Sequence, residues 1–141
     1  MTLLSSKRGM KIMAVRKIEH VGIMVQSLEK SITFYQDIIG LQCLHILQPS
    51  ETVRLAFLAF PGAKETEIEL VEKSTNSEFP AEGKVHHLAF TVEDIEGEMT
   101  RLQSLNLKLI HQQIVTLPNG GRYFFFEGPD GEQLEFFEPA R

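Results

Sequence analysis

Two histidines and two glutamates recur at matching positions in the two halves of the sequence. His20 lies in the segment IEHVGIMV, and His87 lies 67 residues later in the segment VHHLAFTV. Glu69 in IELVE and Glu135 in LEFFE are 66 residues apart. All four residues occur in segments with the alternation and composition of β-strands. A repeat that preserved only a fold would not need to keep its ionisable strand residues, so this spacing indicates that the four residues have a chemical role.

Two imidazoles and two carboxylates make a mixed nitrogen and oxygen donor set for one divalent cation. Such a set suits Zn, Ni, Co, Mn or Fe. Alternation places His20, Glu69, His87 and Glu135 among neighbours that are not uniformly apolar, so we expect all four to point to one concave face. An octahedral ion held by four side chains keeps open positions for substrate, and it can stabilise the enolate that forms when a proton leaves an adjacent carbon.

The elements around these residues have the same order in both halves. In the first half we expect a strand, a helix and three strands, at residues 18–25, 27–40, 41–47, 53–60 and 66–71. The corresponding elements of the second half are expected at residues 85–92, 94–106, 107–115, 122–126 and 133–137. Each helix is indicated by an apolar stripe that follows a capping residue, Ser27 or Asp94. The chain therefore predicts an α+β fold made of two βαβββ modules.

We expect one domain, over residues 17–141, that contains both modules. The first module is placed at residues 17–73 and the second at 84–138, with a polar linker between them. Residues 1–16 precede the repeat and are expected to form an N-terminal extension.

Composition excludes several classes of function. Hydrophobic residues make up 43% of the chain and charged residues 23%, as in a globular domain, and no apolar run is long enough to cross a bilayer. The net charge of −5 and the scattered Lys and Arg residues argue against nucleic acid as a partner. The single cysteine, Cys43, cannot form an internal disulfide. We therefore expect a cytoplasmic protein that acts on a small molecule, away from membranes.

The paired modules resemble the vicinal oxygen chelate superfamily, which includes glyoxalase I, methylmalonyl-CoA epimerase, extradiol dioxygenases and fosfomycin or bleomycin resistance proteins. The motifs that carry the resemblance are HHLAF, IELVE and GPDGEQLEF, and it covers about residues 17 to 138. The resemblance implies modules that form a cupped, incomplete barrel in a homodimer. It also implies that the family's metal positions match His20, Glu69, His87 and Glu135 one for one.

The complete set of two histidines and two glutamates looks more like glyoxalase I than like an extradiol dioxygenase, which uses two histidines and one glutamate with redox-active iron. The resemblance therefore implies a metal-dependent lyase or isomerase that transfers a proton next to a carbonyl through an enediolate. We expect Glu135 first, and Glu69 second, to act as the base, because the histidines are better kept as neutral ligands.

Other positions bear on the substrate. Similar bacterial glyoxalases usually carry a glutathione-binding arginine four residues after the first histidine and an asparagine four after the first glutamate, where this chain has Met24 and Lys73. Met24 is expected to line the substrate site, and the difference favours a hemithioacetal of a thiol other than glutathione. An acyl-CoA is the alternative, because KIEHVGIMVQSLEKSITFYQDIIGL and KVHHLAFTVEDIEGEM look similar to methylmalonyl-CoA epimerase and Glu51 lies near the place of its catalytic carboxylate. A non-catalytic small-molecule binding or resistance protein is the second alternative.

The remaining candidates are polar residues of the expected strands. Arg54 and Arg122 each open the third strand of a module and can bind a carboxylate or phosphate of the substrate. Thr91 has the same parity in its strand as the second histidine of the set and is also expected to contact substrate. His45 and His111 are 66 residues apart but lie in ordinary strands, so we do not expect them to bind metal.

Overall fold

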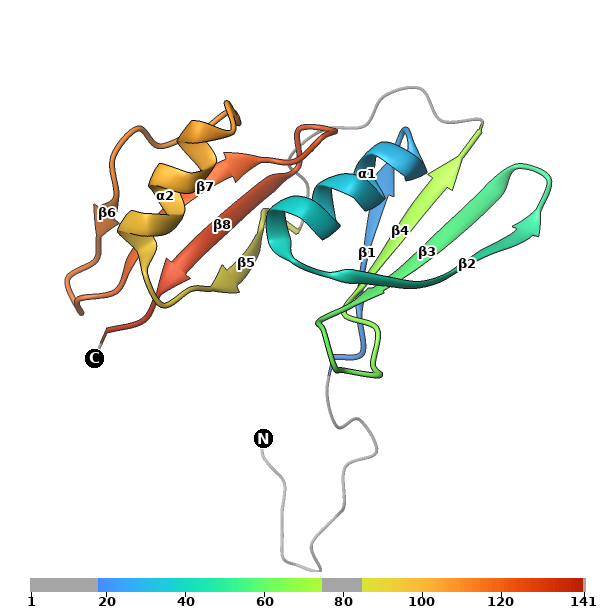
Figure 1. The fold of residues 1–141 in the computed structure, drawn as a ribbon, viewed down its shortest axis with the longest axis horizontal. Helices are drawn as coiled ribbons and strands as arrows, with labels where there is room; N and C mark the ends of the chain where they lie inside the picture. Colours follow the sequence, from blue (N-terminus) through green and yellow to red (C-terminus); the bar gives the residue numbers. More distant parts are fainter. Residues whose placement is uncertain (1–17, 75–84, 141) are drawn as a thin grey trace, which may run out of the picture.

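The computed structural model describes residues 18–74 and 85–140 (Figure 1). The expected N-terminal extension and most of the expected linker lie outside these residues. The described chain forms two modules, each with a four-stranded sheet and an α-helix, which confirms the predicted α+β fold. Neither of these sheets closes into a barrel. None of the described helices is long and apolar enough to cross a membrane.

The first module has a sheet in the strand order β1-β4-β3-β2. Its elements are β1 (Val21–Val25), α1 (Leu28–Phe34), the π-helical segment η1 (Tyr35–Ile39), β2 (Gln42–Ser50), β3 (Val53–Ala59) and β4 (Ile68–Lys73). β1 runs parallel to β4, and the other neighbouring strands are antiparallel. Gly40 ends the helical segment at a φ of 96°, a left-handed conformation that costs glycine little because it has no Cβ.

The second module repeats this order, with a sheet β5-β8-β7-β6. Its elements are β5 (Leu88–Thr91), α2 (Ile95–Ser104), β6 (Val115–Thr116), β7 (Arg122–Glu127) and β8 (Gln133–Glu138). β5 runs parallel to β8, as β1 does to β4. Asn106 has a φ of 59° just after α2, so it takes the left-handed conformation that Gly40 takes in the first module.

The strand expected at residues 107–115 is the main difference between the prediction and the structure. Only an isolated bridge between Leu109 and Phe126 and the short β6 remain of it. Between them the backbone leaves the ladder, and the side chain of His111 accepts a hydrogen bond from Phe125 N on β7. Alternation in the sequence indicated a strand there, but a pattern of side chains does not reveal that one of them replaces a main-chain partner.

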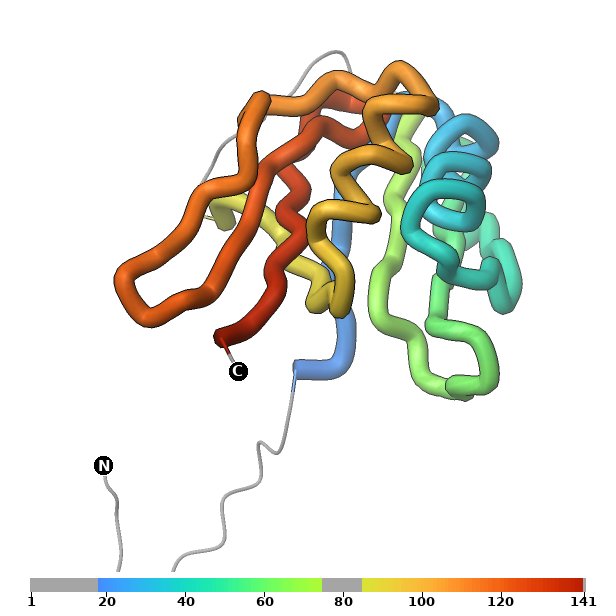
Figure 2. The backbone as a smooth tube through the Cα atoms, turned by 60° about the vertical axis from the view of Figure 1, so that its left-hand side comes forward, coloured from blue at the N-terminus to red at the C-terminus, as the bar shows by residue number. Residues whose placement is uncertain are grey.

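Each helix covers one face of its own sheet. α1 packs on β3 and β4, and α2 packs on β7 and β8 (Figure 1). The two modules lie side by side (Figure 2), and their buried side chains form one continuous core. The largest fully buried side chains of this core are Val25, Leu28, Tyr35, Leu58, Leu70, Ile95, Leu102, Phe124, Phe126 and Leu134. None of the helices in the described residues covers the opposite face of either sheet, which we call the open face.

Arg54 connects the start of α1 to the sheet beneath it. Its guanidinium binds Glu29 in the first turn of α1 at 2.7 Å and Glu72 on β4 at 2.8 Å. The second oxygen of Glu72 accepts a hydrogen bond from Leu28 N at 2.8 Å, one of the amides that a helix start leaves without a partner. The hydrogen bond from Arg54 holds the pKa of Glu72 below its usual range.

The second module repeats this contact with equivalent residues. Arg122 binds Glu96 in the first turn of α2 and Glu138 on β8, the latter at 2.6 Å. Glu138 in turn accepts a hydrogen bond from Ile95 N at 3.3 Å. Both arginines therefore lie on the helix-covered faces, where they bind carboxylates of the protein itself.

Tyr35 links the two modules, and its hydroxyl offers a test of the fold. Tyr35 is fully buried and donates a hydrogen bond of 2.7 Å to Glu132, which lies between β7 and β8. Tyr35→Phe removes the donor from a carboxylate, and we expect the free energy of unfolding to fall by about 1.5 kcal/mol. Denaturant unfolding at fixed protein concentration measures this loss. Tyr123→Phe is the matched control, because the Tyr123 ring is only half-buried, and an equal loss in both variants would contradict the assignment.

Candidate metal site: two pairs of histidine and glutamate

The first pair lies on the open face of the first sheet. His20 directly precedes β1, and Glu69 lies on β4 opposite Gly22. Because the two strands are parallel and adjacent, His20 Nε2 comes within 3.1 Å of Glu69 Oε1. The other ring nitrogen of His20, Nδ1, contacts the carboxylate of Glu19. That hydrogen bond is the main reason why the pKa of His20 is raised, and the charge of Glu69 adds to it.

The second pair has the same geometry on the open face of the second sheet. His87 directly precedes β5, Glu135 lies on β8, and His87 Nε2 is 3.0 Å from Glu135 Oε1. Glu135 is the more buried of the two glutamates, with 9% of its side chain exposed against 19% for Glu69. Burial raises the pKa of Glu135, while the nearby His87 and His111 act in the opposite direction.

Each pair fits two neighbouring positions around a divalent metal. Two ligand atoms at a right angle, with bonds of ~2.1 Å, lie ~3.0 Å apart, and each pair has its nitrogen and oxygen at nearly this separation. Within residues 18–74 and 85–140, however, no group of three or more His, Cys, Asp or Glu side chains is close enough to hold a metal. One chain therefore brings the four predicted ligands together as two separate pairs, and not on one concave face.

An aromatic ring lies beside each pair, which the sequence analysis did not single out. Phe57 on β3 is the register partner of Glu69, and Phe125 on β7 is the register partner of Glu135. The Phe125 ring packs against the His87 ring with centroids 4.8 Å apart. The two phenylalanines have the same parity in equivalent strands, so the repeat contained the signal. They give each pair a partly apolar wall.

Of the other predicted substrate residues, the two arginines face away from the pairs. Arg54 and Arg122 are engaged by glutamates on the helix-covered faces, as described above. Met24 is half-buried on β1 and has Val71 as its register partner on β4. Glu51 is exposed in the turn between β2 and β3.

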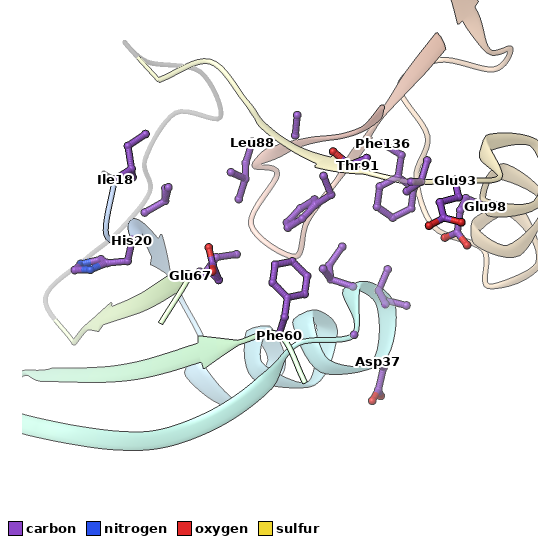
Figure 3. A pocket seen from close by; sticks show the side chains of 18 of the residues that line it. Ile18, His20, Asp37, Phe60, Glu67, Leu88, Thr91, Glu93, Glu98 and Phe136 are labelled. Carbon is purple, nitrogen blue, oxygen red and sulfur yellow. The ribbon is translucent and has the colours of Figure 1, made fainter. Parts of the chain in front are cut away.

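A crevice of about 850 Å³ lies between the two modules (Figure 3). Of the four candidate ligands, only His20 reaches it. Figure 3 shows His20 and Glu67 at one end and Thr91 and Glu93 towards the other, with Phe60 between them. The crevice thus contains Thr91 and one histidine, but it does not contain either complete pair.

Comparisons with known proteins agree with this fold. Residues 17–136 match the family described as the Glyoxalase/Bleomycin resistance protein/Dioxygenase superfamily. The chain is 48% identical over 124 residues to the uncharacterized protein YwbC of Bacillus subtilis. This alignment covers 87% of this chain and 98% of YwbC. It is 28% identical over 124 residues to a lactoylglutathione lyase of Haemophilus influenzae, and the alignment covers 86% of this chain and 92% of the lyase.

Solved structures show the same arrangement of modules. The trypanothione-dependent glyoxalase I of Leishmania major has a TM-score of 0.72 and 24% sequence identity, over 88% of this chain and 87% of that chain. A glyoxalase/bleomycin resistance protein/dioxygenase domain from Frankia has a TM-score of 0.75 and 23% identity, over 91% of this chain and 94% of that domain. At these identities the two likenesses show the fold alone.

Proposed function

Because the chain belongs to the Glyoxalase/Bleomycin resistance protein/Dioxygenase superfamily, we propose that it is a metal-dependent lyase of the glyoxalase I type. The observation that carries this proposal is the presence of two preformed pairs, His20 with Glu69 and His87 with Glu135, each with the spacing of neighbouring metal ligands. The similarity to a lactoylglutathione lyase over most of both chains supports the same reaction type.

The complete site is proposed to form between two chains. Each pair supplies half of a four-ligand set, and each lies on a sheet face that is free of helices within residues 18–74 and 85–140. We call the open face of the first sheet, with His20 and Glu69, the first open face, and that of the second sheet, with His87 and Glu135, the second open face. In a dimer with twofold symmetry, the first open face of one chain can meet the second open face of its partner, which produces two identical sites. The exposed apolar side chains of β2, namely Leu44, Ile46 and Leu47, give such a dimer apolar surface to bury.

The side chains of the pairs divide the chemistry between them. When bound, the divalent cation polarises a substrate carbonyl and lowers the cost of negative charge on its oxygen. His20 and His87 would hold it as neutral rings. Glu135 takes the proton from the hydroxyl-bearing carbon of a hemithioacetal and returns it to the neighbouring carbonyl carbon, which isomerises the substrate to a 2-hydroxy thioester with no net gain or loss of hydrogen. Phe125 shields this transfer from water.

The proposed substrate is the hemithioacetal of a 2-oxoaldehyde with a cellular thiol. Met24 and Lys73 stand where an arginine and an asparagine would support glutathione, so another thiol is favoured. Arg54 and Arg122 are not assigned to substrate, because both bind glutamates of the protein.

Metal content and turnover test the proposal together. Protein purified without a metal-affinity tag is expected to contain one divalent metal per chain by elemental analysis, since two chains would share two sites. Methylglyoxal should be converted with at least one of glutathione, cysteine and coenzyme A, and the rate should fall to background after chelation and return with added Ni, Co, Zn or Mn. Epimerisation of methylmalonyl-CoA without conversion of hemithioacetals would favour an epimerase, and neither activity would favour a binding protein.

A further inference from the structure

His111 fills a position in the second sheet that a strand would normally occupy. Ile110 N donates to Phe125 O at 2.8 Å, as in a regular ladder. The amide of Phe125 on β7 donates to no backbone carbonyl of the described residues, but to His111 Nδ1 at 3.0 Å. The imidazole therefore completes the hydrogen bonding of β7 at the register position of Glu135, and irregular strand pairing of this kind often lies next to functional sites.

This hydrogen bond determines which ring nitrogen carries hydrogen. Nδ1 can accept from Phe125 N only when it has no proton, so the neutral ring has its hydrogen on Nε2. In the described part of the chain, the hydrogen bonds of the His111 ring are those of Nδ1 alone, which leaves the Nε2 hydrogen available. The ring packs edge-on against Tyr123 and Phe125, both of which belong to the open face.

The position of His111 relative to the proposed base is also defined. Phe125, whose amide binds the His111 ring, is the register partner of Glu135 on β8. The Phe125 ring also packs against both His87 and His111. His111 nevertheless makes no direct contact with the carboxylate or with His87. It therefore lies at the edge of the pair, beside the Phe125 ring.

We propose that His111 is a substrate-binding residue, which donates a fixed hydrogen bond from Nε2 to an oxygen of the ligand held beside His87 and Glu135. The inference rests on the proposed function, because it takes that ligand to bind the metal through its oxygen atoms. The donor is fixed by the backbone of β7, so it does not have to be ordered when the ligand binds. It also favours substrates with a second oxygen next to the one at the metal, as in a hydroxy ketone.

The corresponding histidine of the first module, His45, provides a control. It lies opposite Phe57 at an irregularity between β2 and β3, so the repeat places a histidine at the same edge. Its ring, however, stacks face to face on Phe57, with centroids 4.7 Å apart and an angle of 24°. In the part of the chain that the structure describes, no backbone amide donates to this ring. We expect ligand binding to depend strongly on His111 and weakly on His45.

Two substitutions separate the binding role from the structural role. The amide oxygen of His111→Asn can replace Nδ1 as acceptor for Phe125 N, but this variant lacks a donor at Nε2. The amide nitrogen of His111→Gln can replace the Nε2 donor, but this variant lacks the acceptor at Nδ1. Both variants lose the aromatic ring, so they are matched. Zn-loaded protein is titrated calorimetrically with acetohydroxamate, a small chelate with two adjacent oxygens, and thermal melting and zinc content are recorded for each variant.

The two variants are expected to differ in opposite ways in melting temperature and in acetohydroxamate binding. His111→Asn should melt close to wild type yet bind acetohydroxamate about tenfold more weakly, whereas His111→Gln should melt at a lower temperature yet bind close to wild type. His45→Asn should bind as wild type does, and all variants should keep their zinc. Equal binding by wild type and His111→Asn, weaker binding by His111→Gln than by His111→Asn, or no binding by wild type would each overturn the role of His111.

The same titration distinguishes failure of this inference from failure of the proposed function. If wild type converts methylglyoxal adducts but His111→Asn binds acetohydroxamate normally, the lyase assignment stands and the His111 assignment fails. If wild type converts no adduct but His111→Asn still binds acetohydroxamate more weakly, His111 binds ligand in a protein with another reaction.

Discussion

Glu135→Gln is expected to lower kcat with methylglyoxal adducts by roughly 10²-fold to 10⁴-fold, the usual contribution of a positioned general base. Glu135 is preferred over Glu69 because it is the more buried carboxylate, and a less hydrated carboxylate is the stronger base. Glutamine has the same shape and can still meet His87 Nε2, so the sheet and the metal ligand at this position should persist. Steady-state kinetics and circular dichroism of the purified variant measure the two effects.

The controls separate loss of the base from loss of metal or fold. Glu127→Gln changes a glutamate of β7 that pairs with Lys108 at 3.3 Å, a surface ion pair, and should keep both activity and melting temperature. Metal content is measured in parallel, and the assay is repeated with excess metal. If excess metal restores the rate of Glu135→Gln, Glu135 is a ligand only. Turnover within a few-fold of wild type would refute its role as the base.

The repeat predicted most of what positions the pairs. One offset related both histidines and a second related both glutamates, and each histidine was found beside the glutamate of its own module. The faces were predictable because alternation assigns each strand residue to a face of its sheet. The parallel pairing of the first strand with the fourth in each module, which brings each histidine to its glutamate, was not predicted. The two expected helices end at residues 40 and 106, and the structure gives Gly40 and Asn106 a positive φ, which both residue types tolerate.

Other features depend on distances that alternation does not contain. Parity indicates that a residue faces away from the helix, but it does not say whether the two open faces of one chain meet. The role of His111 as a partner for Phe125 N is likewise a matter of backbone position. Arg54 is a different case. It was expected to bind substrate, although it has the same parity as Ala56 and Leu58, which the structure places in the core.

Mixing two inactive variants is expected to restore activity, because the proposed site takes one pair from each chain. His20→Ala removes a ligand from the first open face, and His87→Ala removes one from the second. Each homodimer then has two defective sites. In a mixed dimer, however, one site receives both substitutions and the other receives none, so one intact site forms.

The expected recovery can be estimated from random assortment of chains. An equal mixture that is unfolded and refolded together gives half mixed dimers, each with one intact site of two, so the rate should approach about a quarter of wild type from a starting value near background. Light scattering should report twice the 16.0 kDa mass of one chain for wild type and for both variants. A monomeric mass would count against the dimer itself.

A second mixture of variants is the control for this result. Mixing His20→Ala with Glu69→Ala should restore nothing, since both substitutions affect the first open face and every mixed dimer keeps a defect in each site. If a single chain folded its own two pairs into one site, neither mixture would recover activity, although each variant would still be a dimer. Recovery in the first mixture and not in the second therefore requires that His20 with Glu69 and His87 with Glu135 come from different chains in each working site.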